Sequence, residues 1–182
     1  MAPKSRLSDH AASRPPCTLS TTILISETAQ LTGSHPISIG EHTVLHPRCR
    51  LNSTLGPITI GDYCILNERV NIAAPDREGC KIENYVMVEM NAVVEARSVG
   101  EGTFIEVGAK LGGKCIVGKN CKFSPLTTVG EEEIVEDDTV IYGYGERRKD
   151  MSANKETRKK LVERQIEGLR ALIKSDRAKF LT

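Results

Sequence analysis

The sequence is poor in aromatic residues and has no long apolar run. It contains no tryptophan, three phenylalanines and four tyrosines among its 182 residues. No run of about eighteen apolar residues occurs, so the sequence predicts no membrane insertion. The amino terminus lacks the apolar centre of a secretory signal, which favours a cytoplasmic protein whose cysteines stay reduced. A core with so few large rings has to be filled by smaller side chains.

Histidine and metal-site motifs are also scarce. The four histidines are His10, His35, His42 and His46, and none follows. The six cysteines form no CxxC pair and no Cys/His spacing typical of zinc. Three histidine ligands around zinc would require histidines further along the chain. The sequence therefore predicts no metal site and no cofactor, and it restricts a histidine general base to His42 or His46.

An apolar residue instead recurs every six positions in the second half of the chain. This period is neither the 3.6 of a helix nor the 2 of an ordinary strand. A column of mostly small residues lies four positions after each anchor, with Glu133 as its exception. The pattern predicts a solenoid of hexapeptide repeats, in which each unit is a short strand with a turn and three units form one triangular coil. Its apolar anchors are Val99, Ile105, Leu111, Val117, Phe123, Val129, Val135 and Ile141.

The same spacing extends back towards the amino terminus with interruptions. Three extra residues around 54–57 shift its phase, and the polar insertion at 74–79 reads as a loop that leaves the coil. One residue is then missing before Val99. The anchors predicted to face inward in this part are Ile39, Leu45, Leu51, Ile60, Leu66, Ile72, Ile82, Val88 and Val94.

These units define the predicted domain. Ile25, Leu31 and Ile37 are six apart and suggest a first, imperfect coil. We therefore expect about six or seven coils in residues 18–146. The preceding residues 1–17 are rich in Ser, Ala and Pro, and we expect a disordered arm there.

A basic segment, residues 147–182, follows the repeat. Its part from about 155 to 174 is rich in helix formers, and Asn154 is a plausible N-cap. This predicts a C-terminal helix whose apolar stripe covers either the side of the chain's own solenoid or another subunit. The stripe consists of Val162, Ile166, Leu169 and Ile173.

Charge is distributed unevenly. Residues 1–146 hold 13 Lys/Arg against 19 Asp/Glu, whereas residues 147–182 hold 12 against 5. The acidic runs at 131–133 and 136–138 could bind a divalent ion, but a solvated acidic rim is the simpler interpretation. The basic segment could contact nucleic acid or anionic lipid. Because it lacks interleaved aromatic residues, it matches an acidic protein surface better, and we expect no nucleic-acid partner.

Several segments of the chain have a distinctive sequence at fixed offsets within the repeat. They are Ile39-Gly40 through Thr43-Val44-Leu45-His46-Pro47, Gly56-Pro57-Ile58-Thr59-Ile60-Gly61, Asn67-Glu68, the loop after Ile72, and Thr139-Val140-Ile141-Tyr142-Gly143. In these segments the chain resembles the family of pointed-end light subunits of dynactin, over about residues 20–148. The loop at 75–79 is short for this family, and the basic tail also departs from it.

The resemblance implies an all-β fold, a left-handed parallel β-helix, followed by the C-terminal α-helix. It also implies a non-catalytic structural or adaptor subunit that supports dynein-based cargo attachment and transport on microtubules. The implied partners are dynactin subunit 5 as a heterodimer partner, the pointed-end actin-related protein and the large zinc-binding dynactin subunit, with dynein reached indirectly. The implied location is cytoplasmic and associated with the cytoskeleton. The alternative hypothesis is an acyltransferase-like homotrimeric enzyme that uses His42 or His46.

Overall fold

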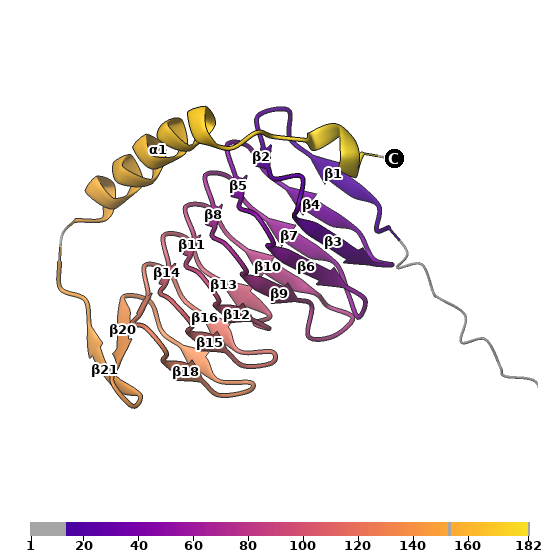
Figure 1. The fold of residues 1–182 in the computed structure, drawn as a ribbon. Coiled ribbons are helices and arrows are strands. Elements are labelled where there is room, and N and C mark those ends of the chain that lie inside the picture. Colours follow the sequence, from indigo (N-terminus) through magenta and orange to yellow (C-terminus); the bar gives the residue numbers. More distant parts are fainter. Residues whose placement is uncertain (1–13, 153, 182) are drawn as a thin grey trace, which may run out of the picture.

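A computed structural model describes residues 14–152 and 154–181. Short strands form three sheets that wrap into a prism (Figure 1). We call them sheets I, II and III, in the order in which the chain enters them. Sheet I contains β1 (Cys17–Leu19), β4 (Ile37–Ile39), β7 (Ile58–Ile60), β10 (Cys80–Ile82), β13 (Ser98–Val99), β16 (Ile116–Val117) and β19 (Ile134–Val135).

The other two sheets complete each coil. Sheet II contains β2 (Leu24–Ile25), β5 (Val44–Leu45), β8 (Ile65–Leu66), β11 (Met87–Val88), β14 (Phe104–Ile105), β17 (Lys122–Phe123), β20 (Thr139–Tyr142) and β21 (Glu146–Lys149). Sheet III contains β3 (Gln30–Gly33), β6 (Arg50–Ser53), β9 (Asn71–Ala73), β12 (Val93–Val94), β15 (Lys110–Leu111) and β18 (Thr128–Val129). The chain therefore makes six complete coils and two sides of a seventh.

The strands pair in parallel, and the register stacks the predicted anchors on one another. Val99 pairs with Val117, and Val117 pairs with Val135. Each of the seventeen predicted anchors is at most 2% exposed except Ile39, at 4%. Because each coil contacts only its neighbours, burial of these columns depends on stacking.

Buried thiols fill the corners of the prism beside these columns. Five of the six cysteines are buried, and Cys17 is half-buried. Burial raises the pKa of the Cys49 thiol to about 12, and the same cause raises that of Cys64 to about 12. These side chains therefore stay neutral and act as small apolar fillers.

The first coil begins earlier than the sequence pattern suggested. Its anchors are Leu19, Ile25 and Leu31, which pair with Ile39, Leu45 and Leu51. Ile37 does not continue this column, because it lies in β4 of the second coil and pairs with Ile58. Strand β1 starts at Cys17, which is the last residue of the predicted arm. Residues 1–13 of this arm lie outside the described residues.

All variation in coil length occurs where the chain passes from sheet III to sheet I. The anchors on sheets I, II and III remain six residues apart within every coil. The loop at 73–79 lengthens the third coil, and a salt bridge of 2.8 Å from Arg97 to Asp76 holds it against the next coil. The ladders are therefore continuous past the insertions.

Helix α1 (Lys155–Leu172) lies along the outside of sheet II (Figure 1). Its Asn154 N-cap position makes no side-chain capping hydrogen bond. Val162 and Ile166 are buried, while Leu169 and Ile173 pack at the edge of the same cluster. The sheet residues beneath them are Leu24, Val44, Ile65 and Met87. The helix therefore covers its own prism, and among the described residues no helix is long and apolar enough to cross a membrane.

Polar contacts fix α1 at the corner between sheets I and II. The Lys159 ammonium lies 2.7 Å from a Glu101 carboxylate oxygen, and the Tyr85 hydroxyl donates to Glu163 at 3.0 Å. The rings of Tyr85, Tyr63 and His42 stack along the corner, with centroids 5.0 and 4.8 Å apart. Desolvation and the Glu163 carboxylate raise the pKa of Tyr85 to about 12, so this hydroxyl remains a donor.

The two ends of the prism are covered differently. At the C-terminal end, β21 turns back and pairs antiparallel with β20. At the N-terminal end, the segment after α1, which contains the 3-10 helix η1 (Arg177–Phe180), crosses the first coil. Phe180 packs against the core cluster there. The sequence pattern indicated neither cover.

Candidate functional surfaces

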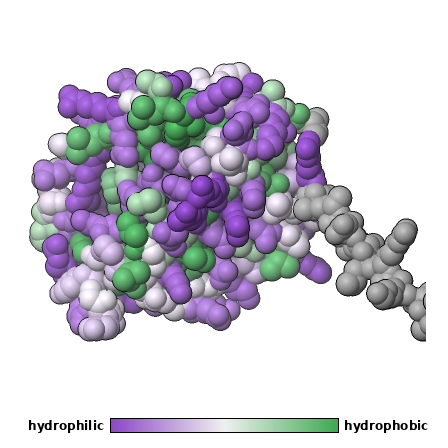
Figure 2. All heavy atoms as spheres, viewed as in Figure 1, coloured by the Kyte–Doolittle hydropathy of each residue, from purple (hydrophilic) through white to green (hydrophobic). Residues whose placement is uncertain are grey.

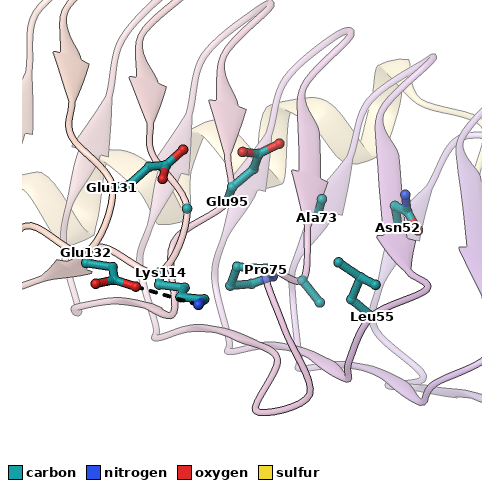
Figure 3. A pocket seen from close by; sticks show the side chains of 10 residues that line it. Asn52, Leu55, Ala73, Pro75, Glu95, Lys114, Glu131 and Glu132 are labelled. Carbon is teal, nitrogen blue, oxygen red and sulfur yellow. Dashed lines mark ion pairs between the residues drawn. The ribbon is translucent and has the colours of Figure 1, made fainter.

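A groove runs along the corner between sheets III and I. It has a volume of about 420 Å³, and the two insertions form its wall through Leu55 and Pro75 (Figure 3). Leu55 is 56% exposed, which is high for a leucine. Only the coils before β12 carry these insertions, so the groove opens towards the later coils.

The open part of this groove is mainly acidic. Glu95, Glu131 and Glu132 line it, and its one lysine, Lys114, pairs with Glu132 at 3.6 Å (Figure 3). The residues that line it include no nucleophile with a neighbouring base. Hydrophilic side chains also cover most of the face in Figure 2, with scattered hydrophobic ones between them.

The histidines of the catalytic alternative do not form a site together. His42 stacks on Tyr63, and its Nδ1 lies 2.6 Å from an Arg170 nitrogen. His46 lies at the next corner, where burial lowers its pKa and its Nε2 has no hydrogen-bond partner. Local packing accounts for the ring of His42, whereas the Nε2 of His46 is left without a partner among the described residues.

Three side chains of the acidic runs pair with basic side chains of the tail. Arg147 pairs with Glu133, Lys149 with Glu136 at 2.8 Å, and Lys155 with Asp138 at 2.6 Å. Hydrogen bonding to Lys149 lowers the pKa of Glu136. Among the described residues, no group of three or more His, Cys, Asp and Glu side chains could hold a metal ion.

Sequence comparison finds several dynactin subunit 6 proteins among the relatives of this chain. The chain is 28% identical over 131 residues to dynactin subunit 6 of Nematostella vectensis, covering 66% of this chain and 70% of that protein. It is 31% identical over 120 residues to dynactin subunit 6 of Dictyostelium discoideum, covering 65% and 62%. The resemblance to dynactin subunit 6 is confirmed. The Xenopus tropicalis protein is similar at 29% identity, with 59% of each chain covered, and no family model matches.

Solved structures support the fold alone. A hexapeptide transferase family protein from Anaplasma phagocytophilum superposes with a TM-score of 0.75 at 14% identity, covering 88% of this chain and 98% of that one. GDP-perosamine N-acetyltransferase from Caulobacter crescentus gives 0.53 at 17% identity, covering 75% and 58%. The fold is a left-handed parallel β-helix of hexapeptide repeats, as predicted. At these identities the likeness says nothing about activity.

Proposed function

We propose that the chain is a non-catalytic structural and adaptor subunit of a dynactin-type complex. The observation that carries this proposal is the similarity to dynactin subunit 6 proteins at 27–31% identity. The match spans 70% of the Nematostella relative and about 60% of the others, so their assembly is carried over as a proposal. In this role the β-helix supplies surfaces for partner subunits.

The proposed position is the pointed end of the complex, where the subunit supports dynein-based cargo attachment. Its direct partners there are dynactin subunit 5, the pointed-end actin-related protein and the large zinc-binding subunit. The proposed location is cytoplasmic and cytoskeleton-associated. The acidic groove and the end of the prism beside β18 are surfaces whose composition suits protein partners.

A non-catalytic role agrees with the packing of His42, whose ring is stacked on Tyr63 and faces Arg170. His46 has its pKa lowered by burial, and its Nε2 has no hydrogen-bond partner among the described residues, so a variant that replaces both rings is needed to test for a base.

The test is affinity purification of the tagged full chain from native extract, with the co-purifying chains quantified by mass spectrometry. We expect dynactin and actin-related chains in near-equimolar amounts. The matched control replaces both candidate bases, His42→Gln with His46→Gln, and should recover the same chains. Recovery of the chain alone as a homotrimer would reject the proposal and favour the acyltransferase alternative, which binding of coenzyme A would then test.

A further inference from the structure

Hydrogen bonds between coils run in both directions, so each end of the prism exposes backbone groups that a further coil would pair. Beside each anchor an N–H donates to a carbonyl of the next coil, as Ile116 does to Glu133 at 2.8 Å and Gly118 to Val135 at 2.8 Å. At the turns an N–H donates back to the preceding coil, as Asn120 does to Glu101 at 2.8 Å. The first coil is therefore left with outward carbonyls and N–H groups, and the last strands are left with outward N–H groups beside their anchors, at the edge of an open sheet.

The chain's own tail covers outward groups of the first coil at the N-terminal end, where the Ser175 hydroxyl accepts from the Ile25 N–H at 3.1 Å. Arg177 donates to the Leu19 carbonyl at 3.0 Å, and the Asp176 N–H donates to that of Ile25 at 2.9 Å. The Ser175 hydroxyl donates to the Ile23 carbonyl at 3.3 Å. These groups take the place that a preceding coil would occupy. A second copy of the chain therefore meets an occupied edge at this end and cannot stack there head to tail.

The C-terminal end is covered on one side only. Strand β21 pairs with β20, but β18 and β19 are the outermost strands of their sheets. By the repeat, the outward donors here are the N–H groups of Thr128, Gly130, Ile134 and Glu136. A Glu133 carboxylate oxygen accepts from Gly130 at 2.9 Å, and the other three have no acceptor among the described residues.

The surroundings of this edge carry both apolar surface and negative charge. Ile134 is 68% exposed on β19 and lies beside a hollow of about 400 Å³, whose side towards β21 is lined by Arg147, Arg148 and Lys149, so the negative charge is confined to the corner on the other side of β19. The corner between β18 and β19 carries Glu131 and Glu132, and no Lys or Arg occurs in residues 123–146. Glu133 and Glu136 are already paired with the tail, and Glu132 lies 3.6 Å from Lys114, whereas Glu131 has no ion pair among the described residues. With two glutamates and one lysine, this corner has a net negative charge.

We propose that the uncovered edges of β18 and β19 bind an extended, lysine- or arginine-bearing segment of another protein by strand addition. The segment's carbonyls accept from Thr128, Ile134 and Glu136, and an apolar side chain covers Ile134. Its basic side chains face Glu131 and Glu132. Backbone hydrogen bonds supply affinity in this mode, and side chains at the corner supply selectivity. This inference goes beyond the dynactin proposal, because it rests on strand edges alone.

The test uses two synthetic octapeptides, one alternating lysine with valine and threonine, the other with glutamate in place of lysine. Amide hydrogen exchange of the full chain is followed by NMR with each peptide. We expect the lysine peptide to slow exchange at Thr128, Ile134 and Glu136 at least tenfold and the glutamate peptide to have no effect. Unchanged exchange at these amides, or equal protection by both peptides, would overturn the proposal. Concentration-dependent protection without peptide would identify a second copy as the occupant and also overturn it.

Variants separate the edge from the general surface. Thr128→Pro removes an N–H that no described group uses and should weaken lysine-peptide binding at least tenfold, whereas Thr128→Val keeps the donor and should bind like wild type. The double variant Glu131→Lys with Glu132→Lys should also weaken lysine-peptide binding at least tenfold, although it leaves the backbone donors in place. It replaces the proline variant as the test if Thr128→Pro does not fold. The co-purification assay tests the dynactin proposal separately, so the failure of one proposal is distinguishable from the failure of the other.

Discussion

Truncation of Ile166 should release helix α1 from the prism without unfolding the coils. Ile166 is 2% exposed and lies in the cluster formed by α1 and sheet II. Each coil is held mainly by its neighbours, so loss of the helix leaves the ladders intact. The change Ile166→Ala therefore acts on docking of the helix rather than on global stability.

The magnitude follows from the buried volume that the substitution removes. Ile→Ala deletes three carbon atoms, and each buried methylene contributes about 0.8 kcal/mol. An unfilled cavity raises the total to about 2–4 kcal/mol. The polar contacts that remain, such as Lys159 with Glu101 at 2.7 Å, are partly exposed and contribute at most about 1 kcal/mol each. The docking equilibrium should therefore fall by a factor of about 30 to 1000.

Amide hydrogen exchange across the whole chain measures this directly. An undocked 18-residue helix is only marginally stable in water, so its amides should exchange faster by about the same factor. Trypsin cleavage after Arg164 and Arg170 should accelerate in parallel. Exchange in β13 and β16, in the body of the prism, should stay at its wild-type rate.

Leu161→Ala is the matched control, because it removes the same number of carbon atoms from a residue of the same helix that is 56% exposed. It should change helix exchange by less than threefold, corresponding to about 0.5 kcal/mol. Equal acceleration by both substitutions would refute the reasoning, since burial would then not decide the effect. Acceleration throughout the coils would refute the independence of helix and prism.

Three further predictions concern the body and the linker. Gly100→Ala should lower the free energy of unfolding in urea by more than about 2 kcal/mol, because its Cβ would lie 2.5 Å from a backbone carbon of the next coil. Gly168→Ala should raise the free energy of unfolding by about 0.5–1 kcal/mol, because its Cβ meets nothing within 4 Å on the helix. The free energy of unfolding should fall as pH rises above about 9, by about 1.4 kcal/mol per pH unit for each of the buried thiols of Cys49, Cys64 and Cys80. The reason is that the unfolded chain loses thiol protons that the folded chain retains up to a pKa of about 12. Urea titrations at pH 8 and 10 check this, and a flat profile contradicts it. The ion pair of Asp150 with Arg158, at 2.5 Å, lowers the pKa of the Asp150 carboxyl and should hold the connection between β21 and α1 against proteolysis above about pH 4. This protection should be lost as pH falls and the carboxylate becomes protonated. Asp150→Asn should remove this pH dependence of proteolysis.

The prism could be predicted from sequence because its signal is periodic. Each buried anchor is repeated six residues later, so phase shifts at 54–57 and 74–79 could be followed through the pattern. The same logic failed at the first coil, where Ile37 has the expected spacing from Leu31 but lies two residues before the true anchor, Ile39. Strand β4 contains two buried isoleucines, Ile37 and Ile39, and only the strand pairing shows that Ile39 stacks on the first-coil anchor Leu19.

The covers of the two ends could not be predicted in this way. Strand β21 is exposed along its whole length, so it carries no apolar alternation. The tail reaches the first coil through contacts such as Arg177 with Leu19, which are separated by 158 positions. Such contacts depend on which backbone groups an end leaves unpaired, and this appears only once the coils are assembled. The stripe on α1 was visible because it repeats at helical spacing.

The connection from sheet III to sheet I is the part of each coil whose length varies. Successive coils start at Leu19, Ile39, Ile60, Ile82 and Val99, so their lengths differ although each contributes the same three strands. A longer connection adds surface without moving the strands above or below it. New segments, whether acquired in evolution or introduced as an epitope or a probe, can be placed at this corner while the rest of the prism keeps its dimensions. The molecule can therefore change what it displays along one ridge while its frame stays constant.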